Sequence, residues 1–487
     1  MKKIKKAWGF YLFFFVLLAF FSWYIFQLTN FPIFADEAIY LFWTQKIIFK
    51  IESPFISMFD GKPPLFMWLS VLISFIFPDL LFAGRLISVI SLFIFIFLSY
   101  KIISKSSLSW AWSVVILILG SPFIFFHSRL ALLDMLFVSM IGLALLFWSQ
   151  SKLKFKGFLT GLFLGLAFWS KTPALFFLPL PLITAIIFKR NKQHIIQSFI
   201  AVFTAVLIIL ILKTNIWFNY LFSRSQDFSY SISQLLSGQF SQIPSNLKLI
   251  FSWLWLYLPW PILILSIIGL YQGLKQKQSL IQTLFIALIL FLSPMVLLGK
   301  ILASRYFLVL GIILPFLAAY SLKNIKPKIL IFILSAYFIF TFSFNYSLQT
   351  DFLKTPLHST DEETYLKEWS SGIGIKQASQ FFQQQAKNNT VQVLTEGNFG
   401  TLPDGLFVSI EPNIIGNNLG IIGVGAAGSD KFIEQLKNTT ADKIYYLGNQ
   451  HRINNLSRDK MQLIKQYPKK DDGPPLELYQ ISKDKYD

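Results

Sequence analysis

The chain has 487 residues, of which 54% are hydrophobic and 14% are charged, and it carries 54 Phe and a formal net charge of +19. Long uninterrupted apolar segments recur as far as Phe344, which excludes an ordinary water-soluble protein and favours a polytopic membrane protein. The absence of Cys excludes disulfides, thiolate metal sites and a Cys nucleophile.

Eleven apolar segments that end in charged loops predict eleven transmembrane helices. The first follows a Lys-rich N-terminus, but it is long and lacks a small-residue cleavage site before Asn30, so we interpret it as a retained span rather than a signal peptide. The predicted spans are residues 8–28, 82–100, 108–126, 136–148, 158–170, 173–188, 195–212, 251–270, 280–298, 306–322 and 329–344.

The charges of the connecting loops fix the topology. Loops near residues 101–105, 152–156, 189–192, 275–277 and 323–328 contain Lys and Arg without any acid, which places them in the cytoplasm together with the N-terminus. All 24 Asp and Glu residues can then lie on the outer side. We therefore predict a multi-pass protein of the plasma (cytoplasmic) membrane with its C-terminal part outside.

One apolar segment, residues 65–77, is too short for a span and is expected to be an interfacial or re-entrant helix on the outer surface. If this segment crossed the membrane, every later loop would change sides and the positive-inside rule would fail in each of them. It therefore stays within a first outer loop, residues 29–81, that carries juxtamembrane helices.

After Phe344 the sequence becomes polar and predicts a small outer α/β domain. Helices are expected at residues 375–386 and 431–436, and strands at 391–394, 443–447 and 476–481. The predicted domains are 1–349, transmembrane and catalytic, and 350–487, extracytoplasmic. Acidic and basic residues nearly balance in the second domain, so the net basic charge belongs to the membrane loops and a nucleic-acid partner is excluded.

Two charged groups of the first outer loop are candidate site residues. Asp36 and Glu37 open a helical stretch beside the membrane, where a partly desolvated carboxylate is well placed to act as a general base. The alternative is that Asp36 caps this helix while Glu37 complements its dipole. Lys62 follows Asp60 and Gly61 and precedes two prolines, which stiffen the backbone and so present its ammonium group. The alternative is that Lys62, at the depth of the lipid headgroups, simply reaches toward lipid phosphates.

Further candidates lie at the outer ends of later spans. Asp134 begins an apolar span, where an acid is costly unless it has a partner or a function. Arg129 is five residues earlier, too far for an ideal pair on one helix face. The remaining candidates are Lys171, Lys300, Arg305 and Tyr306; the Arg305 guanidinium suits a phosphate, while orientation toward lipid headgroups is the alternative for both lysines.

In their order and spacing, these residues resemble the polytopic lipid-linked-sugar glycosyltransferases of the protein O-mannosyltransferase type, glycosyltransferase family 39, and the related aminoarabinose transferase of lipid A. The resemblance extends over the whole chain. It is carried by Asp36-Glu37, Lys62-Pro63-Pro64-Leu65, Arg85-Leu86, Arg129 through Asp134-Met135, Gly165-Leu166-Ala167 with Lys171 and Pro173, Arg305-Tyr306, Trp369 through Gly374, and Thr395-Glu396-Gly397-Asn398.

The resemblance implies a GT-C fold, a polyprenyl-phosphate sugar donor, and an acceptor that is a protein, lipid or glycan hydroxyl. It implies Asp36 as the base or the acceptor-orienting carboxylate, and a sugar or acceptor site that includes Asp134. In-line attack by an acceptor hydroxyl whose proton passes to Asp36 would invert the anomeric centre. The resemblance assigns the donor phosphate to Lys62 and Arg305 with Tyr306; Lys300, Arg129 and Lys171 are further candidates for that phosphate.

Two alternatives stay open at this stage. A flippase or transporter of lipid-linked sugars could use the same outer charges for binding, although the charges lie at the ends of spans rather than at the bilayer midplane, where transport sites are expected. Gly61 stands before Lys62 where the aminoarabinose transferases have an acidic residue, so we assign no metal ligands and no certain cofactor, and leave a divalent metal open. His127, near the Arg129 group, is interpreted as structural.

Overall fold

The computed structural model describes residues 2–150, 153–238, 240–453 and 458–486 and consists of two compact units. The first unit comprises Met1–Leu28, Ser53–Leu69 and Arg85–Thr350. The second comprises Thr29–Glu52, Ser70–Gly84 and Asp351–Asp487. The break after Thr350 lies close to the boundary expected from the sequence, but much of the first outer loop, which we expected in the first domain, is part of the second unit.

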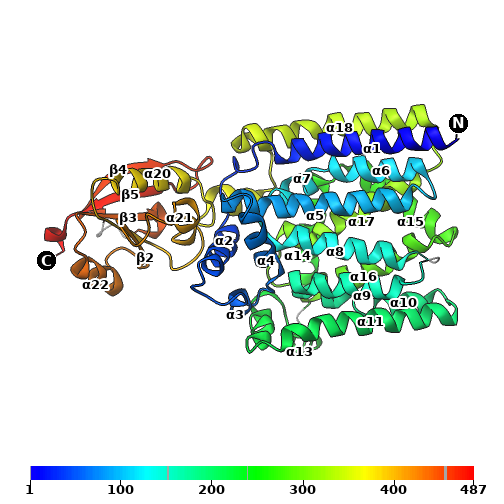
Figure 1. Cartoon of the computed structure of the whole chain (residues 1–487), viewed down its shortest axis with the longest axis horizontal. Coiled ribbons are helices and arrows are strands. Elements are labelled where there is room, and N and C mark those ends of the chain that lie inside the picture. The colour runs from blue at the N-terminus through cyan, green and yellow to red at the C-terminus, as the bar shows by residue number, and fades with distance from the viewer. Residues whose placement is uncertain (1, 151–152, 239, 454–457, 487) are drawn as a thin grey trace. The chain divides into compact units, whose positions relative to one another are not determined.

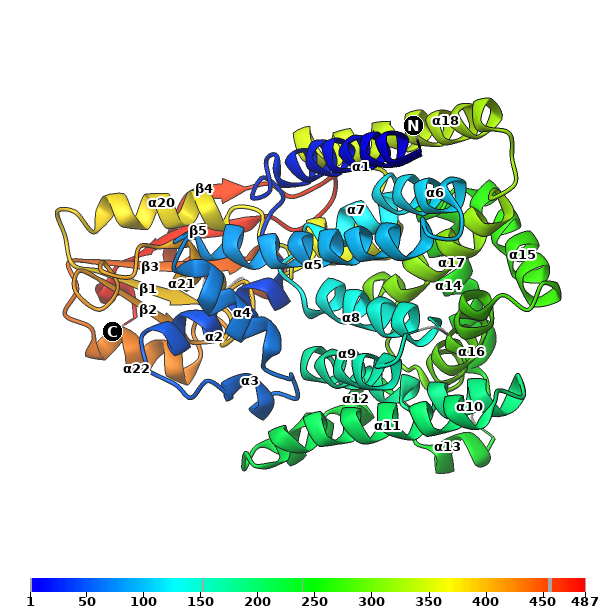
Figure 2. The same ribbon diagram turned by 45° about the vertical axis from the view of Figure 1, so that its right-hand side comes forward.

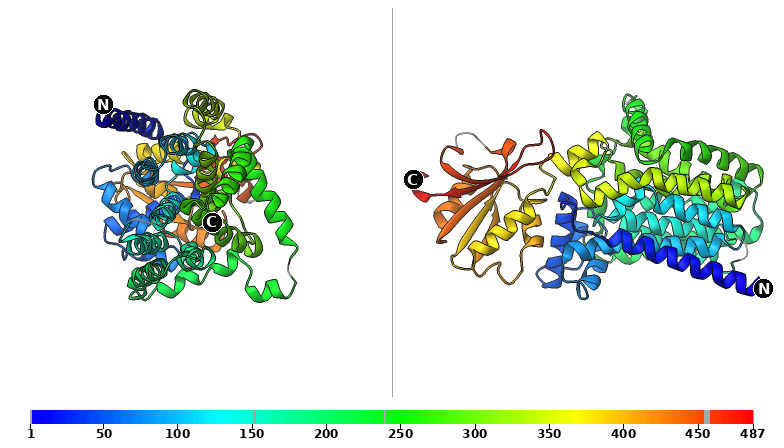
Figure 3. Two further views of the ribbon diagram at one scale, coloured as in Figure 1. Left: turned by 90° about the vertical axis from the view of Figure 1, so that its right-hand side faces the viewer. Right: turned by 90° about the horizontal axis from the view of Figure 1, so that it is seen from above.

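The first unit is a bundle of apolar helices, and Figure 1 shows the Lys-rich loops at the same end of it as the N-terminus. The left view of Figure 3 shows these helices nearly end on. The longer helices that contribute to the unit are α1 (Lys2–Ile25), α5 (Leu80–Ile103), α6 (Leu108–Leu119), α8 (Leu133–Trp148), α9 (Lys156–Ser170), α11 (Lys192–Lys213), α14 (Gln242–Tyr257), α15 (Trp260–Lys275), α16 (Ser279–Leu298), α17 (Leu308–Ser321) and α18 (Pro327–Thr350).

Shorter helices also contribute residues to this unit. They are α3 (Ile56–Phe59), α4 (Leu65–Ser74), α7 (Pro122–Ser128), η1 (Thr172–Phe177), α10 (Leu180–Ile187), η2 (Phe218–Phe222), α12 (Ser225–Phe228), α13 (Ile232–Leu236) and η3 (Ser304–Phe307). Helix α4 is apolar and has 10 residues, too few for a span, as the sequence predicted for this segment.

Each of the eleven predicted spans coincides with a helix or a pair of helices. Within the described part of the chain, five helices are long and apolar enough to cross a membrane, or seven if each of two bent pairs is one span. Helices α6 and α7 meet at 59°, and α14 and α15 at 108°. Residues 251–270, which the sequence predicted as one span, thus form a bent pair of helices, because Pro259 and Pro261 interrupt the helical hydrogen bonds at the centre.

A stripe of glycines brings α9 close to α11, and Figure 2 shows the two helices side by side. Gly157, Gly161 and Gly165 lie one helical turn apart on one face of α9. A Cβ added at Gly161 would overlap the backbone oxygen of Ala201, and one added at Gly165 would meet the side chain of Ile208. Small residues at this spacing allow helix backbones to approach closely in a membrane.

We expect Gly161→Ala to destabilise the protein by about 1 to 3 kcal/mol, because the added methyl group overfills the α9–α11 contact. Thermal unfolding in detergent micelles measures this. Gly9→Ala is the matched control, since a Cβ at Gly9 meets nothing within 4 Å and alanine favours the helix. Equal melting temperatures for the two variants would contradict the packing assigned to the stripe.

The second unit is built on a five-stranded sheet in the order β2-β1-β3-β5-β4, whose strands are labelled in Figure 2. Strands β2, β1 and β3 are parallel, while β5 and β4 continue the sheet antiparallel. The strands are β1 (Val391–Thr395), β2 (Leu419–Gly423), β3 (Lys443–Asn449), β4 (Met461–Tyr467) and β5 (Leu476–Ile481). The predicted α/β domain is thus confirmed, and β2 and β4 are additions to it.

Helices cover both faces of this sheet. On one face Tyr445 contacts Phe381 and Phe382 of α20 (Ile375–Gln385). On the other face Tyr446 contacts Phe432 of α22 (Asp430–Asn438), within a core of buried apolar side chains. The alternation of side chains along each strand produces this two-sided burial.

Helix α2 (Ala35–Ile48), from the first outer loop, packs within the second unit against α21 (Asp404–Ser409). The rings of Phe42 and Phe407 stack at 4.5 Å, and the Ala35 N–H donates to the carbonyl of Ser370 at 3.0 Å. These contacts explain why Thr29–Glu52 belongs to this unit although it lies far from the C-terminal domain in sequence.

Asp404 is a buried acid of α21 whose carboxyl has a raised pKa. Burial raises the pKa of its carboxyl from 3.8 to about 6. Two smaller effects lower this pKa: the Gly400 N–H donates to Oδ2 at 2.8 Å, and the positive charge of Lys46 acts on the carboxylate. The folded state therefore prefers protonated Asp404. The contribution of this group to the stability of the folded state is fully present below pH 3.8 and is lost as the pH rises through 6.

Asp404→Asn is therefore expected to gain stability relative to the wild type as the pH rises from 4 to 8, by up to about 3 kcal/mol. The amide oxygen of Asn can still accept from Gly400, so the variant removes the buried charge and keeps the bond. Melting temperatures of both proteins across this pH range provide the measurement. A difference that stays constant with pH would show that Asp404 does not titrate in this window.

Candidate functional site

The first unit places an acid and a base from two helix ends in direct contact. Asp134 lies in the first turn of α8 and is 5% exposed, while Lys171 follows the last residue of α9 in extended backbone. The Lys171 Nζ lies 2.5 Å from the Asp134 Oδ1. The positive end of the α8 dipole adds to the stabilisation of this carboxylate. Asp134 thus has the partner that its position requires.

Three further side chains join this pair. The Lys171 Nζ lies 4.4 Å from the centroid of the Tyr306 ring, and the Arg305 guanidinium carbon lies 5.4 Å from the same ring. In η3, Ser304 Oγ is 3.2 Å from Nε2 of His127, whose Nδ1 faces the Phe123 carbonyl at 2.9 Å. We call His127, Asp134, Lys171, Arg305 and Tyr306 the central cluster.

His127 is the member of the central cluster that the sequence did not single out for function. It is buried in α7, and both Asp134 and Arg305 are its electrostatic neighbours. Its proximity in sequence to Arg129 and Asp134 was the available signal. Its link to Ser304 joins segments that are 177 residues apart in the chain, which no local pattern reveals.

Arg129, which we expected to bind the donor phosphate, uses its guanidinium to hold the end of α1. It is 4% exposed, and it donates to the carbonyls of Phe26 at 3.1 Å, of Gln27 at 2.9 Å and of Tyr24. Arg85 donates similarly to the Leu28 carbonyl at 2.9 Å. Carbonyls at a helix C-terminus lack helical donors, so this arrangement favours a structural role for Arg129 over phosphate binding.

A second group of charges, the rim cluster, consists of Asp60, Lys62, Arg224 and Lys300. Asp60 lies 2.7 Å from Arg224 and 3.8 Å from Lys62. Both cations also lie near the ring of Phe228, with the Arg224 guanidinium carbon 5.8 Å and the Lys62 Nζ 6.0 Å from its centroid. Lys300 donates to the Gln226 carbonyl at 2.7 Å and lies 5.1 Å from the Tyr230 ring. The structure thus adds Arg224, 46% exposed, to the residues that the sequence suggested.

In the second unit, the structure separates the roles of the two adjacent acids of α2. Glu37 is fully buried, and its Oε2 accepts from the Phe34 N–H at 2.9 Å, so it caps the helix. The alternative that Asp36 provides the cap is thus corrected, and Glu37, which we expected among the catalytic residues, has a capping role. Asp36 is half-buried in the first turn of α2.

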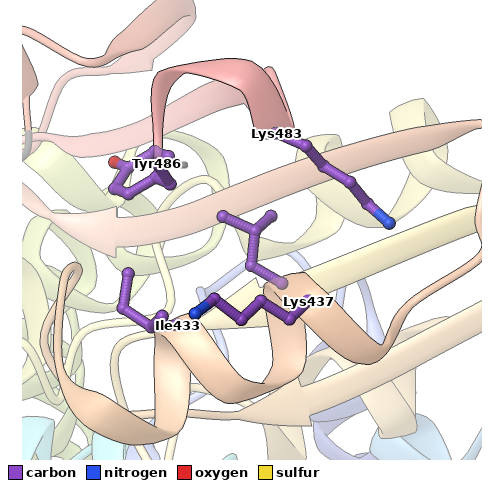
Figure 4. Close-up of a pocket in the computed structure, with 5 residues that line it drawn as sticks. Ile433, Lys437, Lys483 and Tyr486 are labelled. Atoms are coloured by element: carbon purple, nitrogen blue, oxygen red, sulfur yellow. The ribbon is translucent and has the colours of Figure 1, made fainter.

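The described residues contain no group of three or more His, Asp or Glu that could hold a metal ion. A shallow pocket in the second unit, shown in Figure 4, is lined by Ile433, Leu436, Lys437, Lys483 and Tyr486. It contains no acid and none of the residues that the sequence suggested. The chemistry of the chain is therefore best sought in the two charged clusters and at Asp36.

Comparison with known proteins shows which family and which folds the chain is similar to. Residues 61–218, which include Lys62, Asp134 and Lys171, match the model of the dolichyl-phosphate-mannose-protein mannosyltransferase family. The fold is that of solved GT-C enzymes. The chain thus has the GT-C fold of a multi-pass membrane protein, as the sequence resemblance predicted.

Among solved structures, the chain is similar to ArnT from Cupriavidus metallidurans. The apo form matches with a TM-score of 0.64 at 13% identity, over 98% of this chain and 99% of that one. The form bound to undecaprenyl phosphate matches with a TM-score of 0.60 at 13% identity, over 97% and 98%. The apo oligosaccharyltransferase of Archaeoglobus fulgidus matches with a TM-score of 0.52 at 12% identity, over 93% and 70%. No curated protein sequence matches the chain.

The pairing of Asp134 with Lys171 predicts strong energetic coupling. Lys171→Met leaves a buried carboxylate without its cation, and we expect a loss of about 3 kcal/mol. Asp134→Asn alone is also expected to destabilise, whereas the double variant, which buries no charge at these positions, recovers most of the loss. Unfolding in detergent micelles of all four proteins measures this coupling. Additive losses in the double variant would contradict the pair.

Proposed function

We propose that the protein transfers a sugar from a polyprenyl-phosphate donor to an acceptor hydroxyl at the outer membrane surface. The observation that carries this proposal is the central cluster, where two cations flank one tyrosine ring at the ends of membrane helices. It is supported by the family match over residues 61–218 and by the likeness to a structure that contains undecaprenyl phosphate. The acceptor class comprises protein, lipid and glycan hydroxyls.

The proposed reaction exchanges one bond at the anomeric carbon. The acceptor oxygen forms a bond to this carbon, the bond from the carbon to the phosphate oxygen breaks, and the acceptor proton passes to the Asp36 carboxylate. The polyprenyl phosphate leaves with an additional negative charge. Attack on the side opposite the leaving group inverts the anomeric centre.

The cations of the first unit are assigned to the leaving phosphate. Arg305 offers a planar guanidinium that can bind two phosphate oxygens, with Tyr306 beside it as a hydrogen-bond donor. Lys62 and Lys300 of the rim cluster supply further positive charge. Fixed cations stabilise the charge that develops on the leaving group, which is the main requirement of this reaction.

Asp134 and Lys171 are assigned to the sugar or acceptor rather than to the phosphate alone. Because the Lys171 ammonium is already paired with Asp134, it brings little net charge to a phosphate. The pair retains acceptor positions on the carboxylate and donor positions on the ammonium, which suit sugar hydroxyls. This assignment refines the phosphate-binding role that we first expected for Lys171.

Asp36→Asn is expected to lower turnover by about 10²- to 10⁴-fold while donor binding is retained, because the amide cannot take the acceptor proton. Glu52→Gln, at an exposed acid of the same outer loop, is the matched control and should keep wild-type turnover. Turnover is scored as release of labelled sugar from a polyprenyl-phosphate sugar. Wild-type turnover in Asp36→Asn would remove Asp36 from the mechanism.

Arg305→Ala is expected to act on donor binding itself and to raise the donor Kd by about 10- to 100-fold, since one charge-assisted contact to phosphate is removed. Binding of polyprenyl phosphate to purified protein, measured by displacement of a labelled analogue, gives this value. Arg305→Lys should recover part of the affinity through its charge. An unchanged Kd in Arg305→Ala would exclude Arg305 from the phosphate site.

A further inference from the structure

The Lys-rich end of the first unit contains a buried lysine that the proposed reaction does not use. Lys156, the first residue of α9, is 3% exposed, and its Nζ lies 4.3 Å from the ring of Trp148 at the end of α8. This ammonium has no hydrogen-bond partner among the described residues. Lys154, two residues earlier, is exposed, as a lysine that simply reaches into solvent should be.

Two more basic groups surround Lys156. Arg190, between α10 and α11, lies close enough for its charge to act on Lys156, and both charges act on His194 in the first turn of α11. The ring of His194 lies 6.5 Å from that of Trp148. We call Lys156, Arg190 and His194 the inner basic cluster; it draws on the ends of three neighbouring elements.

No acid neutralises this cluster within the described residues. Arg190 donates to neutral acceptors, Gln282 Oε1 at 2.5 Å and Ser279 Oγ at 3.4 Å. His194 Nδ1 lies 2.8 Å from Asn191 Oδ1. The sequence offers few acids that could neutralise the cluster. Asp227 is the single Asp or Glu between residues 135 and 350, and it is paired with Arg224.

A buried ammonium beside a second cation is unfavourable unless an anion compensates it. The Trp148 ring offers a cation–π contact to Lys156, but it brings neither a negative charge nor a hydrogen-bond acceptor for the ammonium protons. The close contact of Gly157 with Gln197 holds the start of α9 against α11 and keeps Lys156 inside. The cluster therefore has the composition of an anion site.

We propose that the inner basic cluster binds a phosphate group, at the end of the bundle opposite to the outer surface where we propose transfer. A phosphate supplies the negative charge and the acceptor oxygens that Lys156 lacks, and helix ends of a membrane protein lie at the depth of lipid headgroups. The phosphate belongs either to an anionic lipid or to a free phosphate ion. This site is independent of the proposed transfer reaction.

The test uses the purified full-length chain and compares wild type with Lys156→Met and Lys154→Met. Met fills the volume of the lysine stem without its charge, and Lys154→Met makes the same change at an exposed position of the same loop. Thermal unfolding is followed in detergent with inorganic phosphate or with chloride at equal ionic strength. It is then followed in vesicles of phosphatidylcholine with or without phosphatidylglycerol.

We expect wild type and Lys154→Met to gain stability with the anion and Lys156→Met to lose at least two thirds of that gain. A gain with phosphatidylglycerol alone assigns the site to a lipid headgroup, a gain with inorganic phosphate alone assigns it to free phosphate, and a gain with both shows that the site accepts either phosphate. Equal gains in all three proteins, or no gain in wild type, would overturn the proposal.

Arg190→Gln is a second variant that keeps the test decisive if Lys156→Met does not fold. It removes one charge from a half-buried position, and its amide can still donate a hydrogen bond to Gln282. It too should lose most of the anion-dependent gain. A full anion-dependent gain in stability of Arg190→Gln would contradict the participation of Arg190. If Lys156→Met also fails to fold, the same result would overturn the proposal itself.

Discussion

The first unit depends on the ion pair between Asp134 and Lys171. A carboxylate at the start of an apolar membrane helix is costly unless a cation neutralises it, and the 2.5 Å contact supplies that cation from the end of the next helix. The pair therefore fixes where α8 begins relative to where α9 ends. Lys171 and Arg305 both lie near the ring of Tyr306, so the partner of this one acid belongs to a cluster drawn from distant parts of the chain.

Helix packing and helix-end contacts hold this arrangement in place. The glycine stripe lets α9 lie directly on α11, which sets the position of the α9 end where Lys171 lies. At another helix end, the Arg129 guanidinium donates to the carbonyls of Phe26 and Gln27, just after α1. Charged side chains in this unit thus fall into two groups: some complete the backbone hydrogen bonds of the bundle, and others form the clusters to which we assign the chemistry in our proposal.

Much of the fold could be predicted because apolar segments and composition changes are local properties. The eleven segments all form helices, and β1, β3 and β5 lie where short apolar runs predicted them. Strand β4 was missed because its interior positions are exposed and show no alternation, and β2 because glycine occupies two of its five positions. The break between α14 and α15 depends on two prolines whose effect was underestimated.

The candidate site was predictable as a set of residue types but not as a set of partners. Asp134 and Lys171 are 37 residues apart, and Arg224 meets Asp60 across 164 residues, so spacing along the chain does not reveal either contact. Glu37 illustrates the reverse, because a local cap explains an acid that could have been catalytic. Which charged side chains contact one another depends on how the helices pack in three dimensions, and sequence periodicity alone does not determine that packing.

The most direct test of the central claim is the fate of a polyprenyl-phosphate sugar, labelled in the sugar, when the purified protein is reconstituted in lipid vesicles. The account predicts that label leaves the lipid and appears on an acceptor, with free polyprenyl phosphate formed in equal amount. Movement of the intact labelled lipid between leaflets, without cleavage across protein, lipid and glycan acceptors, would contradict a transferase and identify a flippase.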